Sequence, residues 1–368
     1  MENWFQIKNI GDIDSPALVV YPQRVKQNIA LAVKMIGDVT RLRPHVKTHK
    51  CKEVSQLLLN AGITKFKCAT IAEAEMLAMV NAPDVLLAYQ PVGPNIDRFI
   101  SLMQNYPRTS FSCLVDDETV VTQLNNAARM VNICLTVYID LNVGMHRTGI
   151  HPEKAFSFYK QISAFNHLQC KGLHAYDGHI HDANFSVRKQ QTDEAFALVE
   201  RVKKEIVEAG FSLPGIVIGG SPTFSIHAKR ASVECSPGTF VYWDYSYATK
   251  YAEQPFLPAA LVVSRIISLP EGDIICADLG HKSIAAENPL NNRVHFINAP
   301  ELIFEGQSEE HLKLKASKNH SYKIGDVLYG MPVHICPTCA LYEKAITVDA
   351  GIAQGEWKTI ARDRKINV

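Results

Sequence analysis

The sequence predicts an α/β protein, with an N-terminal (β/α)8 TIM-like barrel over residues 1–248 and a C-terminal, mostly-β domain over residues 249–368. From residue 16 to about 245, short β-rich runs alternate with longer segments of helical spacing, which is typical of parallel β/α units. After residue 250 the pattern changes to strands joined by turns. The 368 residues also exceed the roughly 250 of one barrel, so two domains are expected, and the extreme N-terminus is free to pair with the β domain.

Strands are expected where apolar runs end at turn residues, and helices where apolar residues follow helical spacing. The segment AFALVERVKKEIVEAG at 195–210 is one such helix, and it ends on Gly210, a residue type that stops helices. The runs expected as barrel strands are PALVVY (16–21), RLRPHVKTHK (41–50), KFKCAT (65–70), DVLLAY (84–89), FSCLVDD (111–117), ICLTVYID (133–140), CKGLHAYDG (170–178) and IVIGGSP (216–222); those of the β domain are AALVVSRIISLP, DIICADLG, RVHFINAPELIFEG, LKLKA and AITVDAG.

Composition and charge indicate an ordinary globular protein. Apolar residues make up 47% and charged residues 20%, and the formal net charge is +1, so neither nucleic acid nor a membrane surface is expected as a partner. No apolar run reaches the roughly 18 residues that span a bilayer. The start of the chain lacks the basic and apolar regions of a secretory signal, and the nine cysteines are scattered. We therefore expect a cytoplasmic protein with reduced, buried thiols.

The segment RPHVKTHK at 43–50 lies at the C-terminal end of an early predicted strand, the end at which β/α barrels carry their active sites. A lysine that bonds to a carbonyl group must first lose its proton, and neighbouring cations favour that loss. Lys47 stands among Arg43, His45, His49 and Lys50, which makes it a candidate for such chemistry. A basic loop after a strand is the alternative interpretation.

Two glycine-rich strand exits are candidate ligand contacts. GMHRTG at 144–149 places Arg147 after one predicted strand, and Gly219-Gly220-Ser221-Pro222-Thr223 follows another, with Pro237-Gly238-Thr239 shortly after it. Late barrel loops often bind phosphate through backbone N–H groups, and the hydroxyls of Ser221 and Thr223 could add bonds. Each motif alone is also compatible with a plain turn, and no dinucleotide or Walker motif occurs in the chain.

Two segments carry possible metal ligands. His174-Ala175-Tyr176-Asp177-Gly178-His179-Ile180-His181-Asp182 is rich in histidine, but its spacing matches no common ligand pattern. On an extended segment, His334 and Cys336 would project from one face as two ligands of one ion. Imidazole with thiolate favours Zn²⁺ over Mn²⁺ or Mg²⁺, and a buried cysteine beside a turn is the alternative.

Taken together, these motifs resemble the D-threonine aldolase and D-serine dehydratase family, which shares the fold of alanine racemase. RPHVKTHK is similar to the family's cofactor-lysine segment, GMHRTG to the segment whose arginine approaches the cofactor ring oxygen, and GGSPT and PGT to its phosphate loops. SEEH at 308–311 and HICPT at 334–338 resemble its β-domain motifs. At the place where alanine racemase has an arginine against the pyridine nitrogen, this chain has Cys235-Ser236, so a racemase-like arrangement is not expected.

The resemblance implies a homodimeric pyridoxal 5′-phosphate enzyme, with a divalent metal, that acts on D-β-hydroxy-α-amino acids. D-threonine cleavage to glycine and acetaldehyde is the expected reaction because AYDGH resembles the aldolases, and D-serine dehydration is the alternative because the His-Cys pair resembles the dehydratases. An amino-acid racemase, a non-catalytic pyridoxal phosphate-binding protein and a metal hydrolase that uses His174, His179 and His181 are more distant alternatives. The expected catalytic residues are Lys47, His45, Arg147 and Tyr176; the expected cofactor contacts are Lys47, Arg147, Tyr176, Gly219, Gly220, Ser221, Thr223, Gly238 and Thr239; the expected metal ligands are His334 and Cys336.

Overall fold

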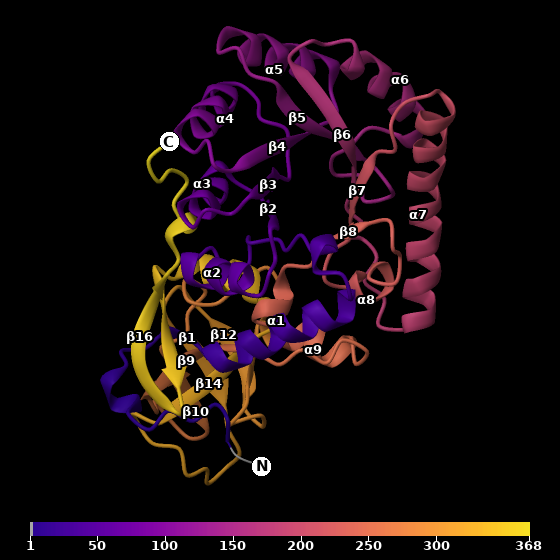
Figure 1. Cartoon of the computed structure of the whole chain (residues 1–368). Coiled ribbons are helices and arrows are strands. Elements are labelled where there is room, and N and C mark those ends of the chain that lie inside the picture. Colours follow the sequence, from indigo (N-terminus) through magenta and orange to yellow (C-terminus); the bar gives the residue numbers. More distant parts are fainter. Residues whose placement is uncertain (1–2) are drawn as a thin grey trace. The chain divides into compact units, whose positions relative to one another are not determined.

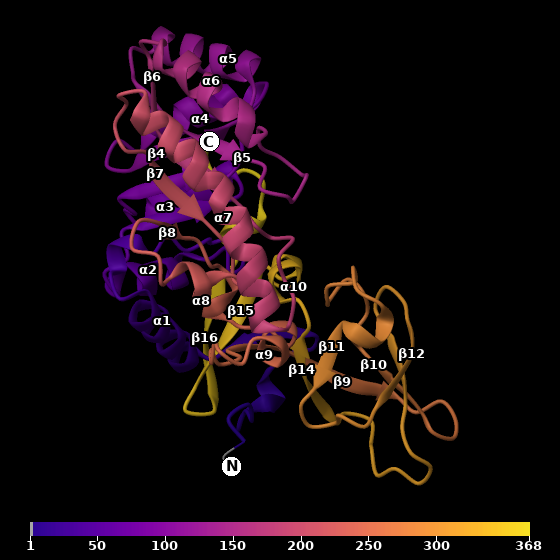
Figure 2. The same cartoon turned by 90° about the vertical axis from the view of Figure 1, so that its right-hand side faces the viewer.

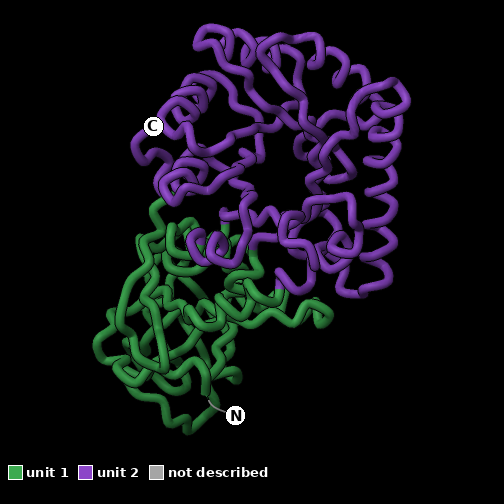
Figure 3. Tube along the Cα trace, in the orientation of Figure 1, with its two compact units in different colours: residues 1–31, 48–54, 239–362 green, residues 32–47, 55–238, 363–368 purple. Residues whose placement is uncertain are grey.

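The structure, a computed structural model, describes residues 3–368. Internal contacts divide the chain into two compact units, coloured separately in Figure 3. Unit 1 holds residues 1–31, 48–54 and 239–362, and unit 2 holds residues 32–47, 55–238 and 363–368. These units do not coincide with the predicted segments 1–248 and 249–368, because the chain passes between the units several times.

Unit 2 is built on seven parallel strands that lie side by side in sequence order, with helices around the outside (Figures 1 and 2). In this order each strand is followed by a helix that returns the chain to the next strand, which is the connection that parallel pairing requires. The strands are β2 (Lys65–Cys68), β3 (Asp84–Leu87), β4 (Ser110–Val115), β5 (Leu135–Leu141), β6 (Leu168–Ala175), β7 (Gly215–Ile218) and β8 (Glu234–Cys235).

Residues 42–46 join the two edges of this sheet. Leu42 forms a parallel bridge with Cys235 of β8, and His45 forms one with Lys67 of β2. The N–H of Arg43 donates to the carbonyl of Cys235 at 2.9 Å, and the N–H of Val46 donates to that of Lys67 at 2.9 Å. The segment therefore acts as the eighth strand and closes the ring, so the predicted barrel followed by a mostly-β region is confirmed as the fold class.

Local signals fix where the helices begin and end. The Thr70 side chain accepts a hydrogen bond from Glu73 at the start of α3, and Asn184 caps α7 in the same way. Gly210, with φ of +85°, follows the end of α7, as the sequence predicts. The helices are α1 (Pro22–Ile36), α2 (Lys52–Asn60), α3 (Ile71–Met79), α4 (Pro94–Asn105), α5 (Glu118–Met130), α6 (Pro152–Ser163), α7 (Phe185–Glu208), α8 (Phe224–His227), α9 (Tyr245–Lys250) and α10 (Ile335–Leu341).

The barrel interior contains a buried arginine. Arg43 is fully buried and donates to Asp84 Oδ1 at 2.6 Å and to Glu234 Oε2 at 2.7 Å. Burial alone would lower the pKa of Arg43, but the carboxylates of Glu234 and Asp84 raise it above its usual value. The guanidinium thus stays charged and ties the closing segment 42–46 to β3 and β8.

Replacing Arg43 with leucine should destabilise unit 2 by about 3 kcal/mol, because it removes the buried cation that Asp84 and Glu234 share and leaves them only the more exposed lysines Lys171 and Lys65. Denaturant unfolding followed by circular dichroism measures this loss. Lys171→Met is the matched control: Lys171 also contacts Asp84, at 3.6 Å, but its side chain is half exposed. We expect a change within about 0.5 kcal/mol for that variant. Equal stability of Arg43→Leu and the wild type would show that the ion pair does not hold the ring.

Unit 1 is a mostly-β unit with a nine-stranded sheet. PALVVY, predicted as a barrel strand, instead forms β1 of this sheet, antiparallel to β9 and parallel to β15. The core beside β1 includes Val19, Tyr21, Leu261 and Val263. The strands are β1 (Ala17–Val20), β9 (Ala260–Ser268), β10 (Ile274–Ala277), β11 (Val294–Phe296), β12 (Ile303–Gln307), β13 (Leu312–Lys315), β14 (Val327–Pro332), β15 (Lys344–Asp349) and β16 (Ile352–Lys358).

All nine cysteines are free. Cys51, Cys68, Cys113, Cys235 and Cys339 are buried, but Cys134 is exposed, so the prediction that the thiols are buried is wrong at that position. Within residues 3–368, no helix combines the length and the apolar character that crossing a membrane requires.

Candidate active site

Lys47 directly follows the closing segment 42–46 and therefore stands at the C-terminal end of the eighth barrel strand. Its backbone N–H donates to His45 Nδ1 at 3.2 Å, and the N–H of His45 donates to the carbonyl of Pro237 at 3.0 Å. His45 is thereby fixed between the lysine and the loop after β8. The Lys47 side chain is half-buried.

Three basic side chains from separate parts of the barrel lie near the ring of Tyr176, just after β6. The Lys47 Nζ lies 5.8 Å from the ring centroid, and the guanidinium carbon of Arg147 lies 5.0 Å from it. The Nζ of Lys67, on β2, lies 5.7 Å from the same centroid. Lys47, Arg147 and Tyr176, all predicted site residues, are thus brought together, and the excess of positive charge suits an anionic ligand.

Two glycines leave room for the Tyr176 ring. A Cβ added to Gly178 would lie 2.3 Å from the ring, and one added to Gly220 would lie 3.0 Å from it. Gly219, with φ of +81°, would bring a Cβ to 2.9 Å from the His227 ring. The predicted phosphate turn therefore approaches Tyr176 closely at Gly220, and the positive φ of Gly219 favours glycine there as well.

Within this turn, the predicted hydroxyls bond to the protein itself. Thr223 Oγ1 accepts from the N–H of Gly220 at 3.3 Å and donates to Asp177 Oδ1 at 3.0 Å. His227 Nε2 lies 2.8 Å from the other oxygen of Asp177. Ser221 Oγ accepts from the N–H of Gly238 at 3.4 Å, which links the turn to the second predicted phosphate loop. The hydroxyls thus shape the turn by bonding to the N–H groups of Gly220 and Gly238.

One buried hydroxyl in unit 2 has no partner. Ser236 is 3% exposed, and its Oγ is one of the few buried side-chain atoms among residues 3–368 without a hydrogen bond. It lies directly before Pro237-Gly238, two residues after Glu234 on the interior face of the barrel. An unpartnered buried hydroxyl, the cations on Tyr176 and the glycine turn together fit a bound aromatic phosphate such as pyridoxal phosphate.

The structure also adds Lys67, which the sequence did not single out. Lys67 is 2% exposed, and its Nζ lies 3.4 Å from His174 Nε2. His174 Nδ1 in turn lies 2.7 Å from Asp140 Oδ1. The sequence signal that could have identified Lys67 is the alternation in KFKC. Lys67 lies between the apolar Phe66 and Cys68 on a short strand, so its side chain points to the opposite face from theirs.

The histidine-rich run does not assemble into a metal site. His174 points into the barrel, whereas His179 packs against Gly144, where a Cβ would lie 2.7 Å from its Nε2. His181 is exposed and bonds to the carbonyl of His179. No group of three or more His, Cys, Asp or Glu side chains is placed to hold a metal ion in the described part of the chain.

In unit 1, His334 and Cys336 are brought together, but not as predicted. The segment is not extended: His334 is the N-cap of α10, and Cys336 lies in its first turn. Burial alone would lower the pKa of His334, but hydrogen bonds from its ring to Cys336 and Glu287 raise it to about 9. A carboxylate on the second ring nitrogen, here Glu287 on Nδ1 at 2.6 Å, is typical of metal-binding histidines. The pair therefore fits two ligands of an ion such as Zn²⁺, which would displace the proton.

The surroundings of Cys336 include two hydroxyls. Thr48 Oγ1 lies 3.0 Å and Thr239 Oγ1 3.6 Å from the Cys336 Sγ. Thr239, a predicted cofactor contact, thus contacts the predicted metal ligand within unit 1. Along the chain, Thr48 directly follows Lys47 and Thr239 directly follows Gly238, so both residues adjoin predicted cofactor residues in sequence.

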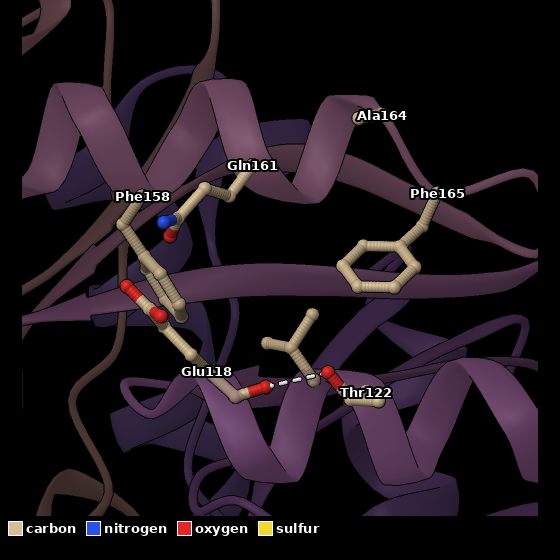
Figure 4. Close-up of a pocket in the computed structure, with 7 residues that line it drawn as sticks. Glu118, Thr122, Phe158, Gln161, Ala164 and Phe165 are labelled. Atoms are coloured by element: carbon tan, nitrogen blue, oxygen red, sulfur yellow. Dashed lines mark hydrogen bonds between the residues drawn. The ribbon is translucent and has the colours of Figure 1, made fainter.

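The cavities of unit 2 differ in size and in the chemistry of their linings. A small cavity of about 10 Å³ adjoins Arg147 and Tyr176. A larger cavity of about 320 Å³ lies between α5 and α6 (Figure 4). Its lining includes Phe158, Phe165 and a single charged side chain, Glu118, and it contains neither a cation nor a histidine. The chemistry of unit 2 is therefore concentrated at Tyr176 and not between the outer helices.

Comparison with known proteins gives two matching family models. The alanine racemase N-terminal domain model matches residues 20–246, and the serine dehydratase domain model matches residues 259–348. The D-threonine aldolase of Arthrobacter sp is 24% identical over 361 residues, which cover 96% of this chain and 94% of that protein. The D-serine dehydratase of Dictyostelium discoideum is 21% identical over 378 residues, covering 91% and 93%.

Among solved structures, that of D-threonine aldolase from Filomicrobium marinum superposes with a TM-score of 0.88 at 23% identity, covering 96% of this chain and 97% of that chain. This likeness shows the fold. The first family model spans more than half of the chain. The resemblance seen in the sequence is thereby confirmed, and the chain belongs to the alanine racemase N-terminal domain family.

Proposed function

We propose that the chain is a pyridoxal phosphate-dependent, metal-assisted lyase that acts on D-β-hydroxy-α-amino acids and cleaves D-threonine to glycine and acetaldehyde. The observation that carries this proposal is the meeting of Lys47 and Arg147 on the ring of Tyr176, beside a glycine turn. A lysine for the carbonyl group, an arginine for an anionic ring oxygen and an aromatic contact surface are what this cofactor needs. The similarity to a D-threonine aldolase along nearly the whole chain supports the substrate class.

Each residue has a defined task in this proposal. Lys47 would hold the cofactor covalently, Arg147 and Tyr176 would contact its ring, and Gly219, Gly220, Ser221, Thr223, Gly238 and Thr239 would contact its phosphate. When bound, pyridoxal phosphate supplies an electron sink for the bond that is broken. His45, whose Nδ1 accepts a hydrogen bond from the Lys47 backbone N–H, would fix the backbone of the lysine. Release of the aldehyde requires a base to take the proton of the substrate β-hydroxyl.

A divalent ion at His334 and Cys336 would supply a Lewis acid for the substrate oxygen. Two protein ligands leave coordination positions open for water and substrate, as catalytic sites require. The thiolate favours Zn²⁺, with Mn²⁺ or Mg²⁺ as alternatives. Thr48 and Thr239 would orient the Cys336 thiolate through their hydroxyls, and Glu287 would orient His334.

D-serine dehydration is the second candidate. The match of residues 259–348 to a serine dehydratase domain and the His-Cys donor pair favour it. In this reaction Lys47 would remove the α-proton of the substrate, and the β-hydroxyl would leave. Lys47 therefore works as a base in the second reaction, whereas the aldolase needs a base at the hydroxyl.

A product assay on the purified, cofactor-loaded protein separates the two reactions. Glycine and acetaldehyde from D-threonine support the aldolase, and pyruvate and ammonia from D-serine support the dehydratase. The L-enantiomers and D-alanine serve as controls for stereochemistry and for racemisation. If neither D-threonine nor D-serine is converted and no absorbance band near the visible edge is lost on hydroxylamine treatment, the proposed function is wrong.

We expect the active form to be a cytoplasmic, two-fold homodimer. A second copy of the chain can cover an active site that must exclude water. Two-fold symmetric dimers are the commonest homo-oligomers. Light scattering at the assay concentration measures the mass of the active species. A monomer with full activity would contradict this expectation.

A further inference from the structure

A buried lysine is the least expected group in the barrel. Lys67 lies on β2 and is 2% exposed, although an ammonium group is costly to remove from water. Its Nζ lies 3.4 Å from His174 Nε2 and 5.7 Å from the centre of the Tyr176 ring. The proposed function assigns Lys67 no role, yet Lys67 contacts the same aromatic ring as Lys47.

His174 is held so that it can accept a hydrogen bond from Lys67. Its Nδ1 lies 2.7 Å from Asp140 Oδ1, and Thr148 Oγ1 donates to Asp140 Oδ2 at 2.8 Å. A carboxylate at this distance fixes the proton on Nδ1, which leaves Nε2 as an acceptor. Burial, followed by the charge of Lys67, lowers the pKa of His174, so the ring is neutral at neutral pH. Lys67 can therefore bond to Nε2 both as an ammonium and as an amine.

The charge on Lys67 depends on the charge on Lys47. Burial, followed by the positive charge of Lys47, lowers the pKa of Lys67 to about 7. Asp140 and Asp177 act in the opposite direction, and Arg43 adds a smaller lowering. Both ammonium groups face the ring of Tyr176 and like charges disfavour each other, so loss of the proton on Lys47 favours a proton on Lys67.

We propose that Lys67 is a positioning residue that takes up a proton when Lys47 gives one up, with His174 and Asp140 holding the lysine in each state. The exchange is balanced: Lys47 goes from ammonium to amine while Lys67 goes from amine to ammonium, and no other group changes. The charge inside the barrel then stays constant, which avoids the cost of adding or removing a buried charge. The role of this exchange in turnover rests on the proposed function, but the titration of Lys67 does not.

The direct test is a pH titration of lysine Nζ resonances in the cofactor-free full-length protein by NMR with isotope-labelled lysine. We expect one resonance with a midpoint near pH 7. It should be absent in Lys67→Met and present in Lys65→Met, the matched control on the same strand. In Lys47→Met the midpoint should rise by about one pH unit or more, a tenfold change in proton affinity, because the repulsion from Lys47 is removed.

Two outcomes would overturn the proposal: a midpoint that does not move in Lys47→Met, or a Lys67 resonance that titrates only in the usual range of lysine. Lys47→Met leaves Lys67 and its partners in place, so this arm remains valid even if Lys67→Met does not fold. If Lys67 only packs in the barrel and does not sense Lys47, its midpoint should be the same in the wild type and in Lys47→Met.

The loaded protein provides a second readout. If Lys67 carries a charge next to the bound cofactor, Lys67→Met should raise the pH midpoint of the cofactor absorbance by about one unit, whereas Lys67→Arg should not raise it. An unchanged midpoint in Lys67→Met would contradict the proposal. A wild-type protein that binds no pyridoxal phosphate would refute the proposed function instead, and the NMR titration would still decide the role of Lys67.

Discussion

Replacing Lys47 with alanine is expected to abolish covalent retention of pyridoxal phosphate and to lower turnover on the order of 10³-fold or more. The reason is that Lys47 ends the closing strand of the barrel and points its ammonium group at Tyr176, where Arg147 also lies. A lysine that both binds the cofactor and exchanges protons with the substrate has two tasks, and alanine performs neither. Absorbance near the visible edge and product formation measure the two losses separately.

The control for this experiment is Lys50→Ala. Lys50 is in the same basic segment, three residues later, so its replacement removes a similar charge without removing the candidate. We expect Lys50→Ala to retain the absorbance band and most of the turnover. Borohydride reduction of the wild type followed by peptide mapping should label Lys47. A label on Lys50, Lys67 or another lysine would show that the assignment of Lys47 is wrong.

Removing the metal is expected to abolish activity and to leave the cofactor absorbance intact. The proposed ion is held by His334 and Cys336 in unit 1, whereas the covalent attachment and the glycine turn belong to unit 2. Exhaustive chelation should therefore inactivate the protein, and Zn²⁺ should restore it. Cys336→Asp should shift the preference toward Mn²⁺ or Mg²⁺, because a carboxylate is a harder ligand than a thiolate.

Glu287→Gln tests the same site more gently. The carboxylate fixes His334 through Nδ1 at 2.6 Å, and loss of such a contact typically weakens metal binding about 10–100-fold. Cys134→Ser, which changes an exposed cysteine, is the control and should behave like the wild type. Full activity after chelation, with no metal found by elemental analysis, would reduce His334 and Cys336 to structural residues at the start of α10.

Much of the candidate site could be predicted from positions along single strands. Lys47, Arg147, Tyr176 and Gly219 each directly follow an apolar run or lie within a few residues of its end. In a parallel barrel the C-terminal ends of all strands face the same side, so residues at these ends were expected to meet. The contacts of Lys47 and Arg147 with Tyr176 agree with that expectation.

The pairing of Lys67 with His174 could not be predicted in the same way. Lys67 lies inside β2 and not after it, and its partner is more than a hundred residues away on β6. The bond depends on how far each strand is shifted relative to its neighbours around the ring, which no single strand specifies. Likewise, HICPT contains no local signal that would distinguish an extended segment from the first turn of α10.

The sequence by itself determined the order of strands and helices, the change to strands joined by turns after residue 250, and the lysine at the end of a strand. These features follow from local periodicity, turn residues and the position of polar side chains relative to each apolar run. Only the tertiary structure decided which strands pair. Residues 17–20 and 65–68 are both short, buried strands, yet β1 joins the sheet of unit 1 and β2 joins the barrel. Apolar side chains encode burial but not the partner that buries them, because the hydrophobic effect is non-directional and pairing arises from contacts distant in sequence.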